Sequence, residues 1–198
     1  MDTRAYVGVL LVLAIVIAYV VFSSRPDTTK DEAVRFVQED LAAKYPDAYY
    51  EILSAEKNGA DWSMKARVTF DADTACPSRL HAYYSYPQFG YVVRDDWITR
   101  NCQVCMDLPL EKCVLFFEEE AVIASHTREG TQLVSNYVRT HPDAMPYARF
   151  YGEEGYPPDN PAYYDVWLVS WSSNSDNSTL NTLLTKAPGN VLTVWGTG

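Results

Sequence analysis

The chain has 198 residues with 26 acidic against 16 basic side chains, so its formal net charge is −10 and its isoelectric point is about 4.7. This balance argues against a nucleic-acid-binding protein, because phosphate recognition depends on clustered Lys and Arg and the sequence has no such cluster. Aromatic residues make up 14%, including 15 Tyr and 5 Trp, which is typical of β-rich structure and of contact surfaces.

An apolar stretch follows a short tail (residues 1–4) at the N-terminus. The 18 residues 5–22 (AYVGVLLVLAIVIAYVVF) contain no charge, amide or proline. As a helix they would rise about 27 Å, close to the ~30 Å of hydrocarbon in a bilayer. They predict a single-pass transmembrane anchor over 5–23 that contacts membrane lipid.

Two alternatives stay open for this stretch: a cleaved signal peptide and a buried helix of a soluble fold. A signal peptide has a shorter apolar region, roughly 7–15 residues, and a small-x-small cleavage site, whereas Phe22 stands where a small residue is needed. Basic residues flank both ends of the stretch, Arg4 on one side and Arg25 with Lys30 on the other, so the positive-inside rule hardly favours either membrane orientation. The orientation therefore has to be inferred from the cysteines.

A polar linker at 24–30 leads into an amphipathic helix predicted over 31–48. Thr29 is suited to the N-cap, and Pro46 cannot continue the helix. One helical stripe carries the apolar residues Val34, Val37, Leu41 and Tyr45.

A β-hairpin is predicted next, because Asn58-Gly59 accepts the positive φ angles of a two-residue turn. The strand after this turn alternates, which indicates a sheet with one buried and one solvated face. Its apolar face consists of Trp62, Met64, Ala66, Val68 and Phe70. A further strand pair is predicted over 80–86 and 90–97.

The second part of the chain begins with a helical segment over 118–141, predicted in two pieces that separate near Gly130. A long loop is expected over 146–164, followed by a strand over 165–171. The chain closes with a last strand after the turn Pro188-Gly189-Asn190.

An internal repeat is suggested by residues 31–48 and 127–144, which end in Tyr45-Pro46-Asp47-Ala48 and His141-Pro142-Asp143-Ala144. Each is followed by an extended segment, a turn and a Trp-containing strand. We therefore predict two α+β halves, the first over 31–117 with the cysteine cluster and the second over 118–198. A chance match is the alternative, because Pro-Asp is simply a good helix stop.

A helix ended by Pro and followed by a β-meander resembles the cystatin-like and PepSY-type modules of secreted and membrane-anchored proteins. The resemblance rests on 31–70 and, more loosely, on 127–196. It implies a helix packed on an antiparallel sheet and a partner-binding or peptidase-modulating role. The inhibitory Gln-Val-x-Val-Gly sequence of cystatins is absent from the chain.

The four cysteines, all within 38 residues, are the strongest chemical signal. An even count in an exported domain favours two disulfides, and the preferred pairing is Cys76–Cys102 with Cys105–Cys113. The alternatives are a zinc site made of all four cysteines, with Cys102 and Cys105 as one knuckle, and a thiol-redox pair at that CxxC. Disulfides would place the domain outside the cytoplasm.

The loop at 146–164 is the candidate partner-binding surface, because long ordered loops are often functional and tyrosines offer large contact areas. Its aromatic residues are Tyr147, Phe150, Tyr151, Tyr156, Tyr163 and Tyr164. The alternative is that these rings close the core. Asn177 opens a glycosylation sequon, Asn177-Ser178-Thr179, in a Ser/Asn-rich turn.

Catalytic constellations are weak. No His lies in an HExxH motif or accompanies a GxSxG elbow, so we interpret His141 as a helix cap and His126 as a surface residue. A nucleophilic pair of Cys76 with His81 is the remaining possibility. Asp71 and Asp73 superficially resemble the DxDx(T/V) motif of haloacid-dehalogenase-type phosphotransferases, but Ala75 departs from it and a turn is the expected structure.

The triplet Glu118-Glu119-Glu120 suits a solvated helix start, with a metal or cationic-partner patch as the alternative. The predicted fold class is therefore α+β, a transmembrane helix followed by two helix-plus-antiparallel-sheet halves. The predicted function is a membrane-anchored, extracytoplasmic, non-catalytic module with a protein partner and no cofactor, such as a subunit or modulator of a surface or secretion assembly. The alternative is a zinc or thiol-redox protein that uses the cysteine cluster.

Overall fold

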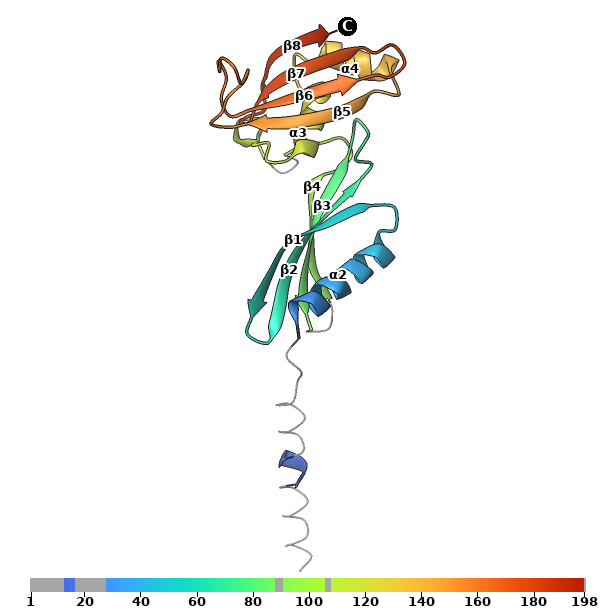
Figure 1. Ribbon diagram of the computed structural model, residues 1–198, viewed down its shortest axis with the longest axis vertical. Helices are drawn as coiled ribbons and strands as arrows, with labels where there is room; N and C mark the ends of the chain where they lie inside the picture. Colours follow the sequence, from blue (N-terminus) through green and yellow to red (C-terminus); the bar gives the residue numbers. More distant parts are fainter. Residues whose placement is uncertain (1–12, 17–27, 88–90, 106–107, 198) are drawn as a thin grey trace, which may run out of the picture.

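Figure 1 shows the computed structural model of the chain, which describes residues 13–16, 28–87, 91–105 and 108–197. Two four-stranded antiparallel sheets follow one another along an elongated molecule, in the orders β1-β2-β3-β4 and β5-β6-β7-β8. The helices are α2 (Lys30–Lys44), the 3-10 helix η1 (Leu110–Lys112), α3 (Glu118–Thr127) and α4 (Gln132–Thr140).

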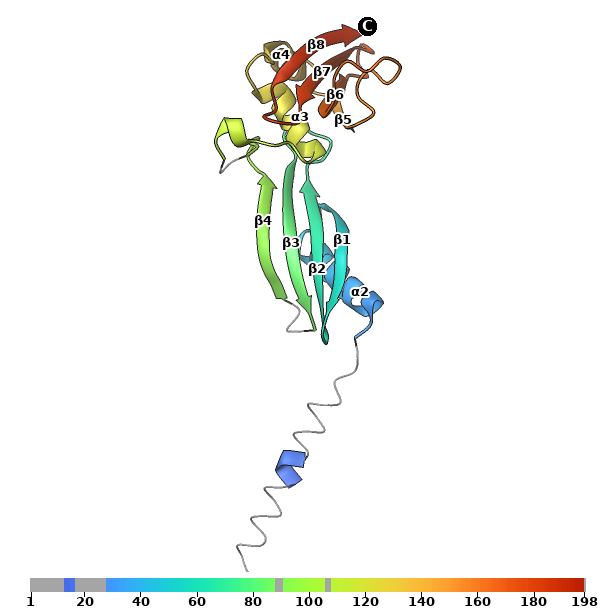
Figure 2. The ribbon, with the colours of Figure 1, turned by 90° about the vertical axis from the view of Figure 1, so that its left-hand side faces the viewer.

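The strands of the first sheet are β1 (Tyr49–Asn58), β2 (Asp61–Phe70), β3 (Ser78–Tyr86) and β4 (Tyr91–Thr99). Those of the second sheet are β5 (Met145–Tyr151), β6 (Val166–Ser172), β7 (Thr179–Thr185) and β8 (Val191–Thr197). Figures 1 and 2 show that the strands of the first sheet run along the long axis of the molecule and that those of the second sheet run across it.

The fold corrects the prediction of an N-terminal transmembrane helix. Of the stretch 5–23, only 13–16 belong to the described residues, and these are helical; the rest of the predicted anchor lies outside the described ranges. Nowhere in the described ranges is a helix both long and apolar enough to cross a membrane. The predicted fold class is wrong in this respect, and the described chain is an α+β fold without that helix.

Helix α2 forms for the reasons expected from its sequence. The Thr29 hydroxyl accepts a hydrogen bond from the backbone N–H of Glu32 at 3.2 Å, which caps the first turn. Ala33, Val37 and Leu41 are fully buried against the first sheet. The helix ends at Lys44, just before Pro46, so its last predicted turn (45–48) is not helical.

The first sheet has two different faces. β1 and β2 are joined by the two-residue turn Gly59-Ala60, one residue later than the predicted Asn58-Gly59, because Asn58 still pairs with Asp61; Gly59 has the predicted positive φ, 63°. The α2-facing side is built from the predicted alternation in β2, with Met64, Ala66 and Val68 in the core. The opposite side carries polar residues and is not covered by a helix along most of its length (Figure 2).

The second sheet packs its inner face against α3 and α4. The predicted break near Gly130 separates these helices. Gly130 has a φ of 87°, a backbone conformation that glycine adopts more readily than other residues. Trp171 and Val134 are completely buried in this core, where the Trp171 indole N–H donates to the Ser125 hydroxyl at 3.0 Å. A third apolar cluster lies on the outer face of the same sheet, where Tyr151, Val166 and Leu183 are buried.

Candidate functional site

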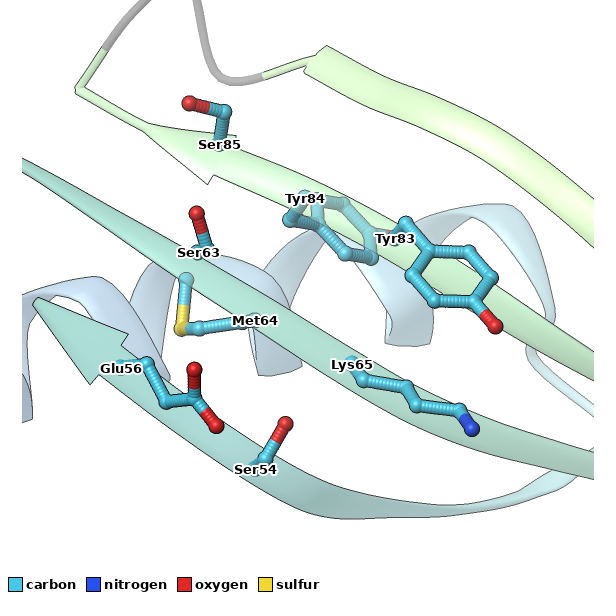
Figure 3. A pocket seen from close by; sticks show the side chains of 8 residues that line it. All are labelled: Ser54, Glu56, Ser63, Met64, Lys65, Tyr83, Tyr84 and Ser85. Atoms are coloured by element: carbon cyan, nitrogen blue, oxygen red, sulfur yellow. The ribbon is translucent and has the colours of Figure 1, made fainter. Parts of the chain in front are cut away.

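A hollow of about 320 Å³ lies on the open face of the first sheet (Figure 3). Strand pairing sets its residues in two rows across neighbouring strands, Ser54–Lys65–Tyr83 and Glu56–Ser63–Ser85. Figure 3 shows these side chains on the side of the sheet away from α2. The lining combines hydroxyls, one ammonium and one carboxylate with apolar surface that includes Met64 and Tyr84.

The register explains why the sheet is hollowed at this level. The β1–β2 pairing slips between Ile52 and Ser54, and the β3–β4 pairing slips between Tyr83 and Tyr84. Both irregularities therefore fall beside the row that contains Lys65. Bulges increase local twist and bend the strand, so irregularities on both sides of one row curl the sheet there.

Farther along this open face, the start of α3 docks on the sheet through a buried ion pair. Nη1 of Arg79 lies 2.7 Å from Oε2 of Glu119, and the Thr69 hydroxyl donates to Oε1 of Glu119 at 3.1 Å. The Arg79 guanidinium also stacks on the Phe117 ring, 3.7 Å from its centre. Burial lowers the pKa of Arg79, and the carboxylate of Glu119 acts in the opposite direction.

His81 lies in the same junction and is 3% exposed. Its Nε2 is 3.4 Å from Nη2 of Arg79, and its ring meets the Phe117 ring edge-on with centroids 5.4 Å apart. Burial above all, and then the charges of Lys65 and Arg79, lower the pKa of His81 to about 4. The imidazole is therefore neutral at pH 7.

The glutamates of α3 correct the interpretation of Glu118-Glu119-Glu120 as a solvated helix start. Glu118 is exposed and lies 3.9 Å from Arg67, but Glu119 and Glu120 are buried. Oε2 of Glu120 accepts from the backbone N–H groups of Phe116 and Phe117 at 2.8 and 2.9 Å, so it caps the helix. Burial raises the pKa of Glu120, and these two donors oppose the rise.

The four cysteines form the predicted pairs Cys76–Cys102 and Cys105–Cys113, with sequence separations of 26 and 8. Every sulfur is thus in a disulfide, so in this structure none is a thiolate that could bind zinc or act as a redox nucleophile. The Cys76–Cys102 bond ties the β2–β3 connection to the turn after β4. The Cys105–Cys113 bond closes the loop that carries η1.

The structure confirms one of the two histidine interpretations and corrects the other. His141 is the C-cap of α4, as predicted. His126 is half-buried, with Nε2 2.7 Å from the carbonyl oxygen of Ala75 and 3.9 Å from Sγ of Cys102, so the surface interpretation is wrong. It is this ring, and not His81, that lies beside the Cys76–Cys102 bond.

Those three side chains also form a compact group of metal-ligand type. A ring nitrogen of His126 and the two sulfurs lie within 4.8 Å of one another. Because both sulfurs belong to the disulfide, the group is not a ligand set as it stands. The Asp71–Asp73 segment is a turn, as predicted, with the backbone N–H of Thr74 donating to the Asp71 carbonyl at 3.0 Å.

The aromatic residues of the predicted partner-binding loop (146–164) are partly exposed and partly buried. The first part of the expected loop is strand β5, where Tyr147 is 65% exposed and Phe150 packs on Trp167. Tyr151 is 5% exposed, and Tyr156 packs on it with ring centroids 5.2 Å apart. These two rings therefore close a core, and we correct their assignment as contact residues.

The rest of the predicted loop, between β5 and β6, is stabilised by its own backbone hydrogen bonds and leaves Tyr163 and Tyr164 exposed to solvent. The backbones of Tyr156 and Tyr163 form two mutual hydrogen bonds of 2.7 and 3.0 Å. Gly155 (φ +66°) lies beneath them, where an added Cβ would approach the Cβ of Pro161 to 2.7 Å. Asn177 is exposed in the β6–β7 turn, and its glycosylation stays a prediction.

A second hollow, of about 260 Å³, was not anticipated from the sequence. It lies where the end of β4 meets the cysteine loop and the extended residues before α3. Three of its residues are large apolar side chains with high exposure: Trp97 (38%), Leu108 (54%) and Phe116 (63%). We call this hollow the apolar groove. A signal existed in the apolar run CVLFF, but the sequence did not say which of its residues faces outward.

Comparisons with known proteins add little to this description. No family model matches the chain, and no curated protein matches its sequence. A solved structure named "putative lipoprotein" from Clostridium difficile 630 aligns over 86% of this chain and 94% of its own, with 13% identity and a TM-score of 0.27. At that TM-score the likeness carries no argument, and the resemblance to cystatin-like and PepSY-type modules stays a prediction.

Proposed function

We propose that this protein is a non-catalytic interaction module that works outside the cytoplasm and binds a protein partner. The two disulfides support the location, because such bonds persist in oxidising compartments and are rare in the reducing cytosol.

The observation that carries the proposal is the apolar groove. Trp97, Leu108 and Phe116 leave about two fifths to two thirds of their surface in water, although the chain has well-filled cores elsewhere. Clustered exposure of this kind, rimmed by polar residues, is typical of an interaction surface. The Cys105–Cys113 bond braces the loop that supplies Leu108, so little order has to be gained on binding.

The buried ionisable groups support a non-catalytic role, because their interactions are structural. Glu119 pairs with Arg79, Glu120 caps α3, and His81 lies between Arg79 and Phe117. Each therefore has a role in holding α3 on the first sheet.

The experiment is a selection of displayed random peptides on the purified oxidised protein, with the reduced and unfolded protein as the counter-selection target. We expect recurring sequences that bind the native form and lose binding when the disulfides are reduced. A selection that enriches no sequence over the unfolded protein would contradict the proposal.

A further inference from the structure

We propose that the apolar groove binds a polypeptide segment in which apolar anchor residues are flanked by carboxylates. This inference rests on the proposed function and names its binding site and the chemistry of its partner.

The inner wall of the groove is fixed by the alternation of the extended residues 113–117. Cys113 and Leu115 are fully buried in the second core, so Val114 and Phe116 face outward into the groove. The backbone N–H of Leu115 donates to the Lys186 carbonyl at 2.8 Å, and its carbonyl accepts from the Trp167 indole at 3.0 Å. Phe116 is therefore held open to solvent by the packing of its neighbours and does not depend on a flexible loop.

The opposite wall comes from Trp97 at the end of β4 and from Leu108 in the cysteine loop. The Trp97 ring stacks on Phe70 with centroids 6.2 Å apart, which fixes its orientation. Figure 2 shows the loop with η1 standing at the end of β4, beside the start of α3. Apolar side chains on both walls leave room for an inserted aliphatic or aromatic anchor.

Three cations surround these walls. The Arg100 guanidinium lies 5.0 Å from the centre of the Trp97 ring, and Nζ of Lys186 lies 5.7 Å from the centre of the Phe116 ring. Lys112 lines the groove directly. None of the three forms an ion pair with a carboxylate of the described ranges, although the whole chain has a net charge of −10. Cations that stand beside apolar side chains and form no ion pair with a described carboxylate favour a partner with carboxylates.

The one carboxylate in the lining does not cancel this rim. Glu120 is 6% exposed, and its Oε2 is already occupied by the N–H groups of Phe116 and Phe117. An incoming carboxylate would therefore meet the three cations at the surface.

An anionic membrane would also match cations beside apolar side chains, but two observations favour a polypeptide. The apolar residues line a hollow, whereas insertion into a lipid surface requires protruding groups. The net charge of −10 also repels an anionic bilayer.

The test uses two fluorescein-labelled peptides and the full oxidised protein. One peptide has Leu and Phe one helical turn apart, flanked by Glu on both sides, and its twin has Lys at every Glu position. Fluorescence anisotropy measures binding at low and at high salt, and vesicles of anionic lipid form a third arm. We expect the Glu peptide to bind about tenfold more tightly than the Lys peptide, with the difference narrowing as salt rises.

Matched variants locate the site. Leu108→Ser with Phe116→Ser removes only exposed apolar groups, so the fold is retained and binding of the Glu peptide is expected to be lost. Arg100→Glu with Lys112→Glu is expected to reverse the preference toward the Lys peptide. Leu133→Ser (65% exposed, on α4) is the control for lost apolar surface and is expected to leave both affinities unchanged.

The outcomes separate this inference from the proposed function. Equal affinity for the two peptides, or unchanged binding by the Leu108→Ser and Phe116→Ser double variant, would overturn the inference, while peptides selected from the random library would still support an interaction module. Vesicle binding that depends on Leu108 and Phe116 without discrimination between the peptides would likewise overturn it and assign the groove to lipid. Reversal of preference by the charge variant would establish it.

Discussion

The buried His81 makes a quantitative prediction about stability and pH. In the unfolded chain its pKa is near 6.5, whereas in the folded protein burial, Lys65 and Arg79 lower it to about 4. Between these values the unfolded state binds a proton that the folded state does not. The stabilising contribution of the neutral imidazole is therefore complete above pH 6.5 and is lost as the pH falls toward 4.

The magnitude follows from the two pKa values. At about 1.4 kcal/mol per pH unit, the difference between 6.5 and about 4 corresponds to about 3 kcal/mol of unfolding free energy. The groups that face His81 include both signs of charge, since Asp96 and Glu119 partly oppose the two cations. The contribution of about 3 kcal/mol from His81 is a large part of the ~5–15 kcal/mol that stabilises a typical domain.

The perturbation that isolates this contribution is His81→Gln, which keeps an acceptor for Arg79 and cannot titrate. Urea unfolding followed by Trp fluorescence gives the free energy of unfolding at a series of pH values from 7.5 to 4. We expect the wild type to lose about 3 kcal/mol more than the variant over this range, because all other titrating groups are shared. Parallel pH curves for the two proteins would refute the assignment of a buried, neutral His81.

Two further predictions use matched pairs of residues. Glu119→Gln leaves the buried guanidinium of Arg79 without its anion. We expect it to lower the free energy of unfolding, measured with urea, by about 3–5 kcal/mol. Glu118→Gln removes a carboxylate that is 57% exposed and is expected to cost less than about 1 kcal/mol; similar losses for the two would contradict the role given to the buried pair. Tyr151→Ala opens a cavity in the outer cluster and is expected to cost about 3–5 kcal/mol, whereas Tyr147→Ala stays within about 0.5 kcal/mol. Equal thermal unfolding curves for these two variants would show that Tyr151 is not a core residue.

Several elements were predictable because their signals are local. The α2 stripe, the hairpin turn at Gly59 (one residue later than predicted) and the break near Gly130 each depend on residues a few positions apart. The cysteine pairing was also predicted correctly. Strand β5 was missed, because its Pro and Tyr residues are typical of a loop. Pro146 is nevertheless tolerated there, since β5 is an edge strand.

The features that failed depend on partners far away in the chain. Glu119 was interpreted as solvated because nothing near it in sequence reveals Arg79, 40 residues earlier. His126 was interpreted as a surface residue for the same reason. Its neighbour Ala75 lies 51 residues earlier in the chain, and its neighbour Trp171 lies on strand β6. The apolar groove likewise joins β4, the cysteine loop and the residues before α3. Such junctions are built by tertiary packing, which no local pattern encodes.

The order of the strands has a consequence for how the chain acquires its structure. In both sheets every strand pairs only with its neighbours in sequence, so the β-structure has a low contact order for a protein of this type. The Cys76–Cys102 bond joins two connections at one end of the first sheet, whereas Cys113 of the other bond is buried in the core of the second sheet. Each meander can therefore form as soon as its own strands have been synthesised, and the burial of Arg79 with Glu119 becomes the late step that fastens two prefolded units.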